Sequence, residues 1–180
     1  KEYTGKPVTQ NIVIKNGNAV LDEGTDYTVT YSANTKVGTV EVTITGTGSY
    51  IGEIKSSFDI LPAKQQIQKL EPLINGFFID WAPKGSATGY EIEYSTNADF
   101  KDSTVKKLTA NKPDTLTISG LTAGNKYYVR VRSYTNVGEK VYYGAWSDSK
   151  NVTAAKYDIT KSAISGISTK TYTGKNITQS

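Results

Sequence analysis

The sequence predicts an all-β chain built of antiparallel β-sandwiches in tandem, on three observations. Apolar and polar residues alternate with a period of two in several short segments, as half-buried strands require. Turn-forming Gly, Asn, Asp and Ser residues separate these segments by about eight to twelve residues, a spacing typical of sandwiches. No segment shows a convincing helical stripe of apolar residues.

Five segments carry the alternation most clearly, and each is predicted to form a strand with one apolar and one polar face. Between the chain start and the first of these strands, the dipeptide Asn16-Gly17 favours a two-residue hairpin in which both turn residues take a positive φ. The predicted strands are 25–31, 39–45, 90–94, 116–118 and 127–131.

Two breaks in the pattern divide the chain into three units. Pro62 cannot donate to a β-ladder and polar residues follow it, so we expect a linker at 62–65. A second boundary is expected at 153–156, where a strand ends and a segment rich in Ser and Thr begins. The predicted units are 1–62, 63–154 and 155–180.

The end of the sequence repeats its beginning. Residues 170–179 (KTYTGKNITQ) and residues 1–10 (KEYTGKPVTQ) are identical at seven of ten positions, and Tyr172 follows Tyr3 by 169 residues. A self-match at a fixed spacing predicts a tandem array. Together with the absence of Met, it predicts a piece of a longer protein, cut out of register with its repeat.

The composition argues against an enzyme and against several kinds of partner. The chain has no Cys and no His, which removes thiol nucleophiles, the usual acid–base group near pH 7 and the commonest zinc ligands, so we predict no cofactor and no metal. The net charge is +4, but the Lys residues are scattered, so no nucleic acid is expected. No apolar stretch approaches the roughly 18 residues that would span a bilayer, so no membrane insertion is expected.

Four motifs of the middle unit form a recognisable set. Trp81 ends the alternating run FFIDW, GYEIEY follows at 89–94, TISGLTAGNKY at 117–127 and GAWS at 144–147. Residues 63–154 therefore resemble a fibronectin type III domain. The resemblance implies that Trp81 lies in the core and that Leu121 sets a turn. It also implies that Tyr127 occupies the tyrosine-corner position, with a buried ring and a hydroxyl bonded to nearby backbone.

The flanking units resemble the short immunoglobulin-like repeats of bacterial surface proteins. Residues 1–62 carry YTGK at 3–6, LDEGTDYTVTY at 21–31, VGTVEVTITGTGSYIG at 37–52 and SFDI at 57–60. Residues 155–180 resemble the opening of the same domain type. In this interpretation residues 159–167 correspond to a leading strand that residues 1–62 lack.

A missing strand leaves an unpaired sheet edge, which invites pairing with another chain. Residues 156–180 of one molecule are therefore predicted to complete the first domain of another, head to tail. The alternative is that this tail packs on its own domain or frays. The other partners expected are neighbouring domains of the same polypeptide.

Aromatic residues near one loop are the candidate ligand contacts. Tyr134, Tyr142, Tyr143 and Trp146 flank the loop TNVGEKVYYG, where flat rings could stack on a polysaccharide or contact a host surface protein. The alternative is that Trp146 and one Tyr cover the open end of the core.

Two groups of acidic residues are candidates for metal binding or catalysis. Asp22, Glu23 and Asp26 share a turn, where such residues usually cap local backbone. Glu91 and Glu93 lie on one face of a strand and are expected to be solvated.

Taken together, the sequence predicts a non-catalytic spacer or adhesive module of a secreted or cell-surface bacterial protein. The alternative is a carbohydrate- or host-ligand-binding accessory module attached to an extracellular hydrolase.

Overall fold

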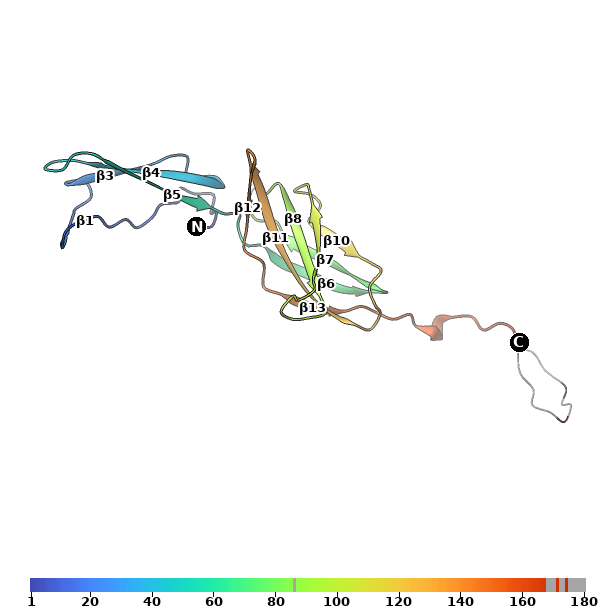
Figure 1. Ribbon diagram of the computed structural model, residues 1–180. Helices are drawn as coiled ribbons and strands as arrows, with labels where there is room; N and C mark the ends of the chain where they lie inside the picture. The colour runs from blue at the N-terminus through green and yellow to red at the C-terminus, as the bar shows by residue number, and fades with distance from the viewer. Residues whose placement is uncertain (86, 168–170, 172–173, 175–180) are drawn as a thin grey trace.

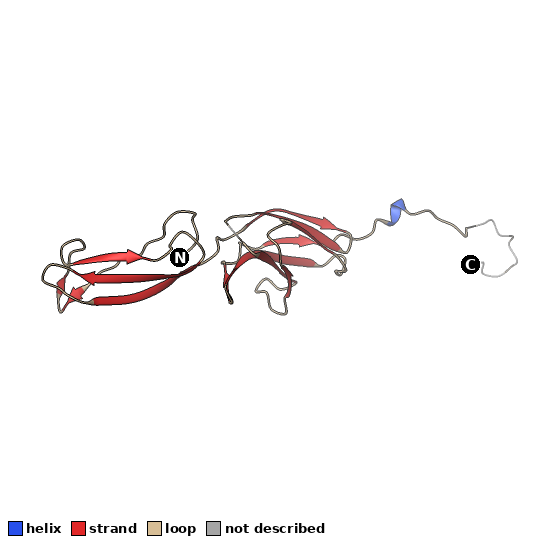
Figure 2. Ribbon diagram, turned by 90° about the horizontal axis from the view of Figure 1, so that it is seen from above, coloured by secondary structure: helices blue, strands red, loops and turns tan. Residues whose placement is uncertain are grey.

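A computed structural model describes residues 1–85, 87–167, 171 and 174. The described residues form two β-structured units in series, followed by a tail that leaves the second unit at its end away from the first (Figures 1 and 2). The tail carries one short 3₁₀ turn, η1 (Ile159–Lys161). The expected all-β class is confirmed.

The first unit is a three-stranded antiparallel sheet with the order β3-β4-β5. Its strands are β3 (Tyr27–Tyr31), β4 (Gly38–Gly46) and β5 (Glu53–Ile60). In β4 the side chains of Val40, Val42 and Ile44 are buried while the polar residues between them are not, which is the alternation expected of a strand with one covered face.

Residues before the sheet cover that face. Tyr27, Val42 and Ile44 form the buried core of the unit, and partly buried side chains from the preceding segment pack on them. The partly buried residues are Ile12, Ile14, Leu21, Val29, Tyr31 and Phe58. The core is small, so the unit depends on nearly all of its strands.

The turn predicted from Asn16-Gly17 is displaced by one residue. In the hairpin of β1 (Lys15–Asn16) and β2 (Ala19–Val20), Asn16 pairs with Ala19, so the two loop residues are Gly17 and Asn18. Gly17 has φ of +60° and the other loop residue does not adopt a positive φ. This is the pattern of a type II′ turn, which needs Gly at its first position, so the expectation of two positive φ values was wrong.

Residues 1–3 run parallel to the end of β5. Glu2 pairs with Leu61, with Tyr3 N donating to Leu61 O and Leu61 N donating to Lys1 O, both at 2.8 Å. The terminal amine of Lys1 also donates to Asp59 O at 2.9 Å. Asp59 and Leu61 therefore turn their backbone groups toward the edge of β5 that β4 does not occupy.

The second unit is a sandwich of two antiparallel sheets. The three-stranded sheet has the order β10-β7-β6, and the five-stranded sheet has the order β12-β11-β8-β9, with β13 also paired to β11. The strands are β6 (Gln66–Leu73), β7 (Gly76–Ala82), β8 (Gly89–Ser95), β9 (Thr104–Leu108), β10 (Thr115–Ile118), β11 (Lys126–Val137), β12 (Lys140–Tyr143) and β13 (Lys150–Thr153).

The core lies between these two sheets. Trp81 is fully buried and meets Tyr90 edge-on, with ring centroids 5.2 Å apart. Tyr127 is also buried, and its hydroxyl accepts a hydrogen bond from Thr122 N at 3.2 Å. Leu121 packs against the core, and its backbone N donates to Asn75 O at 2.8 Å. The hydrogen bond from Thr122 N to the Tyr127 hydroxyl therefore fixes the turn that leads into β11.

We expect Tyr127→Phe to lower the free energy of unfolding of the second unit by about 1 kcal/mol, because it deletes the hydroxyl that pairs with Thr122 N. Both Trp residues of the chain lie in this unit, so tryptophan fluorescence during urea unfolding reports on it alone. Tyr128→Phe is the matched control, since the Tyr128 hydroxyl has no hydrogen-bond partner within the described part of the chain. Equal effects of the two substitutions would contradict the role of the Tyr127 hydroxyl.

Candidate functional site

The four aromatic residues predicted to contact a ligand do not form one exposed strip. Tyr134 on β11 and Tyr142 on β12 are 2% and 5% exposed, while Tyr143 and Trp146 are half-buried. Tyr134 is held between strands, since its hydroxyl donates to Leu108 O at 3.1 Å and Lys107 Nζ lies 4.3 Å from its ring centroid. The rings of Tyr134 and Tyr142 are therefore not presented to solvent.

The two half-buried rings are stacked with arginine side chains. Arg132 Cζ lies 4.2 Å from the Tyr143 ring centroid and 4.3 Å from that of Trp146. Arg130 Cζ lies 4.8 Å from the Trp146 centroid and 3.9 Å from that of Phe100. These five side chains form an alternating row of rings and guanidinium groups, which we call the arginine ladder. The rings of Phe100, Tyr143 and Trp146 thus make cation–π contacts with guanidinium groups of the same chain.

Glu91 and Glu93 form ion pairs with the two arginines of the arginine ladder. Each is only 7% exposed, so the expectation of a solvated acidic face was wrong. Arg132 donates from Nε and Nη2 to Glu91 Oε2 at 2.9 and 2.7 Å, and Arg130 Nε donates to Glu93 Oε2 at 2.6 Å. Because charges this poorly hydrated need partners, the arginines explain why carboxylates are tolerated there.

The sequence does contain a signal for these pairs. Glu91 and Glu93 alternate with apolar residues on β8, and Arg130 and Arg132 do the same on β11. The strand register places Arg130 opposite Glu93 and Arg132 opposite Glu91. Complementary alternation in two segments of opposite charge could have indicated the pairing, although only the register shows which residues meet.

The hairpin of β11 and β12 reaches the first unit. Lys140 Nζ lies 3.1 Å from Asp59 Oδ2, and the hydroxyls of Tyr142 and Thr39 share a hydrogen bond of 2.8 Å. Thr39 also donates to Asp59 Oδ1 at 2.6 Å. The Thr39 hydrogen bond and then Lys140 lower the pKa of Asp59, and the same contact with Asp59 raises the pKa of Lys140. Tyr142 is therefore an interdomain contact, which explains its burial.

The segment that joins the units is bound along its length. Ser133 Oγ donates to Ala63 O at 3.2 Å, and Gln65 Nε2 donates to Ser133 Oγ at 3.0 Å. The Gln65 side chain is buried and its Oε1 accepts from Lys84 N at 3.0 Å. The linker therefore lies on the second unit as part of its fold.

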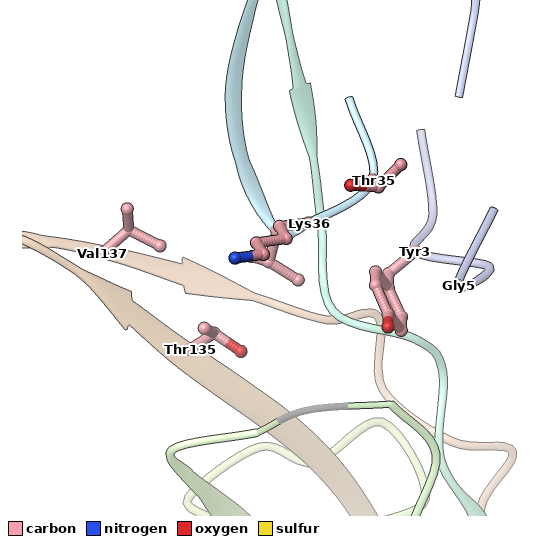
Figure 3. Close-up of a pocket in the computed structure, with 7 residues that line it drawn as sticks. Tyr3, Gly5, Thr35, Lys36, Thr135 and Val137 are labelled. Atoms are coloured by element: carbon pink, nitrogen blue, oxygen red, sulfur yellow. The ribbon is translucent and has the colours of Figure 1, made fainter. Parts of the chain in front are cut away.

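A cleft of about 520 Å³ lies beside this junction. Tyr3, Lys36 and Val37 line it from the first unit, and Thr135 and Val137 from the second (Figure 3). The Tyr3 ring packs closely on the loop between β7 and β8. At Gly85 of this loop there is no room for a side chain, since a Cβ there would lie only 2.8 Å from Tyr3 Cδ1. The cleft brings together one cation and apolar or hydroxyl groups, with no carboxylate among its lining residues.

A second depression brings two carboxylates together, Glu2 and Asp148. Lys64 uses both, since its backbone N donates to Glu2 Oε1 at 2.9 Å and its Nζ donates to Asp148 Oδ1 at 2.7 Å. The Lys64 bond lowers the pKa of Asp148. A glycosidase needs an acid whose pKa is raised, so Asp148, whose pKa is lowered, does not have the property of such an acid.

The acidic turn is organised by local hydrogen bonds. Asp26 Oδ2 accepts from Asp22 N at 3.0 Å, as expected of a turn-capping residue. Within the described ranges, no three Asp or Glu side chains are grouped closely enough to hold a metal ion. No helix of the described chain is long and apolar enough to cross a membrane.

Comparison with known proteins identifies the domain of the second unit. Residues 75–150 match the family model "Fibronectin type III domain", as the sequence motifs predicted. The match does not extend to residues 1–62 or 155–180, whose resemblance to immunoglobulin-like repeats stays a prediction. No curated protein matches the chain.

Several solved structures resemble the chain at low identity. The structure titled "Myokine structure" is 12% identical with a TM-score of 0.44, covering 53% of this chain and 99% of its own. The chicken CNTN1 FN1-FN3 domains are 15% identical with a TM-score of 0.46, covering 67% and 44%. A β-1,2-glucanase from Parabacteroides distasonis is 18% identical with a TM-score of 0.43, covering 65% and 18%.

We expect Glu91→Gln to lower the free energy of unfolding of the second unit by about 1–3 kcal/mol, because it leaves Arg132 without its charged partner beside the Trp146 ring. Glu71→Gln is the matched control. Its pair with Lys69 is exposed on both sides, so the loss should stay within about 0.5 kcal/mol. Urea unfolding followed by tryptophan fluorescence measures both, and a Glu91→Gln effect as small as the control would show that the buried pair is not stabilising.

Proposed function

We propose that the fibronectin type III domain and the unit before it act together as a stiff, non-catalytic spacer in a secreted or surface-attached bacterial protein. The observation that carries this proposal is the bound junction between the two units. A spacer holds other domains at a set distance and direction, and it can do so only when its own units do not swivel.

Three separate contacts resist rotation at the junction. The Asp59–Lys140 pair and the Thr39–Tyr142 hydrogen bond lie on the β12 side. The Tyr3 ring lies against the loop at Gly85. An exposed ion pair contributes little by itself, so the buried Tyr142 ring and the packed Tyr3 ring are expected to dominate.

The covalent connection adds to this restraint. Only residues 61–65 separate β5 from β6, and the hydrogen bonds of Ala63 and Gln65 attach them to β11 and to Lys84. A flexible linker would leave such groups to water. Relative motion of two domains is the general expectation unless their interface is well packed, and here both the linker and the interface are restrained.

The similarity of residues 170–179 to residues 1–10 supports a tandem array of such units, as a spacer would need. The lack of Cys is compatible with an exported bacterial protein. An adhesive role would require a ligand surface in addition. The alternative of a carbohydrate- or host-ligand-binding module loses support. Of the rings predicted to contact a ligand, Tyr134 and Tyr142 are buried, and Tyr143 and Trp146 are in contact with arginine side chains.

The stiffness is testable by spin-label distances. The chain has no Cys, so Thr28→Cys on β3 and Lys106→Cys on β9 provide two unique label sites, one in each unit. We expect a single narrow distance distribution near neutral pH. We expect it to broaden in the double variant Tyr3→Ala/Tyr142→Ala, which removes both packed rings of the junction, and to stay narrow in Glu53→Ala, which removes a carboxylate of the first unit away from the junction.

The same labels predict a pH dependence. Because the folded-state pKa of Asp59 is lowered below 3.8, its contribution is complete above that value and is lost as the pH falls through the lowered pKa. The raised pKa of Lys140 keeps its charge throughout this range. We therefore expect the same distribution between about pH 5 and 8 and a modestly broader one as the pH falls through the lowered pKa of Asp59, because the packed rings remain. A broad distribution in the unaltered chain near neutral pH would refute the proposal.

A further inference from the structure

The edge of β5 that faces away from β4 is largely unpaired. Residues 1–3 occupy only its end, at Asp59 and Leu61. Backbone groups alternate sides along a strand, so those of Ser57, Lys55 and Glu53 point to the same edge. Within the described chain, no strand pairs with them there.

An apolar surface lies directly beside this edge. Two adjoining depressions of about 260 and 240 Å³ open on the sheet, and Ile44 lines both. Ile12 and Phe58 line the first, and Ile54 lines the second. Apolar residues of the first unit's core are thus accessible from the surface, next to a strand edge with unpaired backbone groups. Accessible apolar side chains beside a free strand edge are what an added β-strand binds.

The tail carries an apolar segment with nothing packed on it. Ile164 and Ile167 are 80% and 70% exposed. Between them are only Ser165 and Gly166, and the segment 162–167 is neither helical nor paired. The segment bends at Gly166, which has φ of +79°, but it contains small residues and exposed isoleucines and forms no helix, so it is free to pair with a sheet edge.

The internal repeat connects this segment to that edge. Residue 170 corresponds to Lys1, so Ile164 corresponds to the position six residues before Lys1. The parallel bridge of Glu2 with Leu61 sets the register, and counting back along both strands places that position beside Ile54. Paired residues of parallel strands point to the same side of the sheet, so Ile164 and Ile54 would lie together.

We propose that the free edge of β5 binds residues 162–167 of a second copy of this chain as a parallel strand. The contact is head-to-tail, so it joins copies into a row. In a polypeptide with tandem copies, the same segment would join successive repeats.

The segment does not reach the groove of its own chain. The first unit and the tail lie at opposite ends of the second unit (Figures 1 and 2). A return would have to run past the whole sandwich, whereas a second molecule can present its tail directly.

This inference extends the proposed spacer role from one pair of units to the joining of copies. The two proposals fail separately. The spin labels test the junction within one chain, and the experiments below test association through β5 and the tail.

The first experiment compares three chains by sedimentation velocity up to about 1 mM, where even a millimolar dissociation constant is visible. We expect the full chain and a chain ending after Ile167 to associate with increasing concentration, and a chain ending after Lys156 to stay monomeric. The last retains each strand that the structure describes and the Ala155–Ile74 bridge, so it should fold. Identical sedimentation of all three would overturn the proposal.

The second experiment changes the acceptor edge. Ile54→Lys places a charge at an exposed position of the groove and should abolish association of the full chain. Val105→Lys is the matched control, since Val105 is an exposed apolar residue on β9, the edge strand of another sheet. Association that survives Ile54→Lys, or is lost equally in the control, would overturn the assignment to β5.

The third experiment supplies the segment in cis. Residues 159–169 are placed before Lys1 in the chain ending after Lys156, and amide hydrogen exchange is measured at Lys55 and Ser57. We expect at least tenfold slower exchange than without the extension, and no slowing when Ile164→Asp is introduced in the extension. Unchanged exchange would overturn the groove as a strand site. Slower exchange in a protein whose unaltered form never associates would overturn the second copy as its occupant.

Discussion

The pairing of β11 is the constraint on which the rest of the structure depends. This strand pairs with β8 along one side and with β12 and β13 along the other. Between these two partners Ser147 completes the edge, since its N donates to Val131 O at 2.8 Å and its Oγ accepts from Val131 N at 3.0 Å. One strand thus closes the core of the second unit, presents the arginine ladder and carries the hairpin that contacts the first unit.

The two faces of β11 serve different purposes because side chains alternate across a strand. Val129 and Val131 face the core with no exposure, while Arg130 and Arg132 face outward to Glu93 and Glu91. Aromatic rings shield these ion pairs from water, which strengthens the attraction but makes each charge dependent on its partner. The outer face is consequently a rigid surface, and its rings have a structural use that does not require a ligand.

The sequence was sufficient for the five strands with the clearest alternation and for the core of the second unit, because both follow from local alternation and from spaced motifs around Trp81 and Tyr127. It was insufficient wherever non-local register decides the outcome. Burial of Glu91 depends on which β11 residue lies opposite, and burial of Tyr142 depends on Thr39 of the other unit. The hairpin at Gly17 was predicted, but its turn type was not, because shifting the two loop residues by one position changes which residues need a positive φ. Pairing of residues 1–3 with the end of β5 has no local signal in either segment.

The free sheet edges of the chain are not equally protected. The edge strand β6 contains a bulge between Ile67 and Lys69 and a proline at position 72, and β9 carries Lys106 and Lys107. Bulges, prolines and lysines are the usual means by which proteins prevent edge-to-edge association. The strand β5 carries one lysine, Lys55, but it pairs with β4 in unbroken register, contains no Pro and includes two adjacent serines beside an apolar depression. Since an unprotected edge is an aggregation hazard unless something covers it, the weaker protection of β5 agrees with the strand partner proposed for it, whereas β6 and β9 carry more of these protective features.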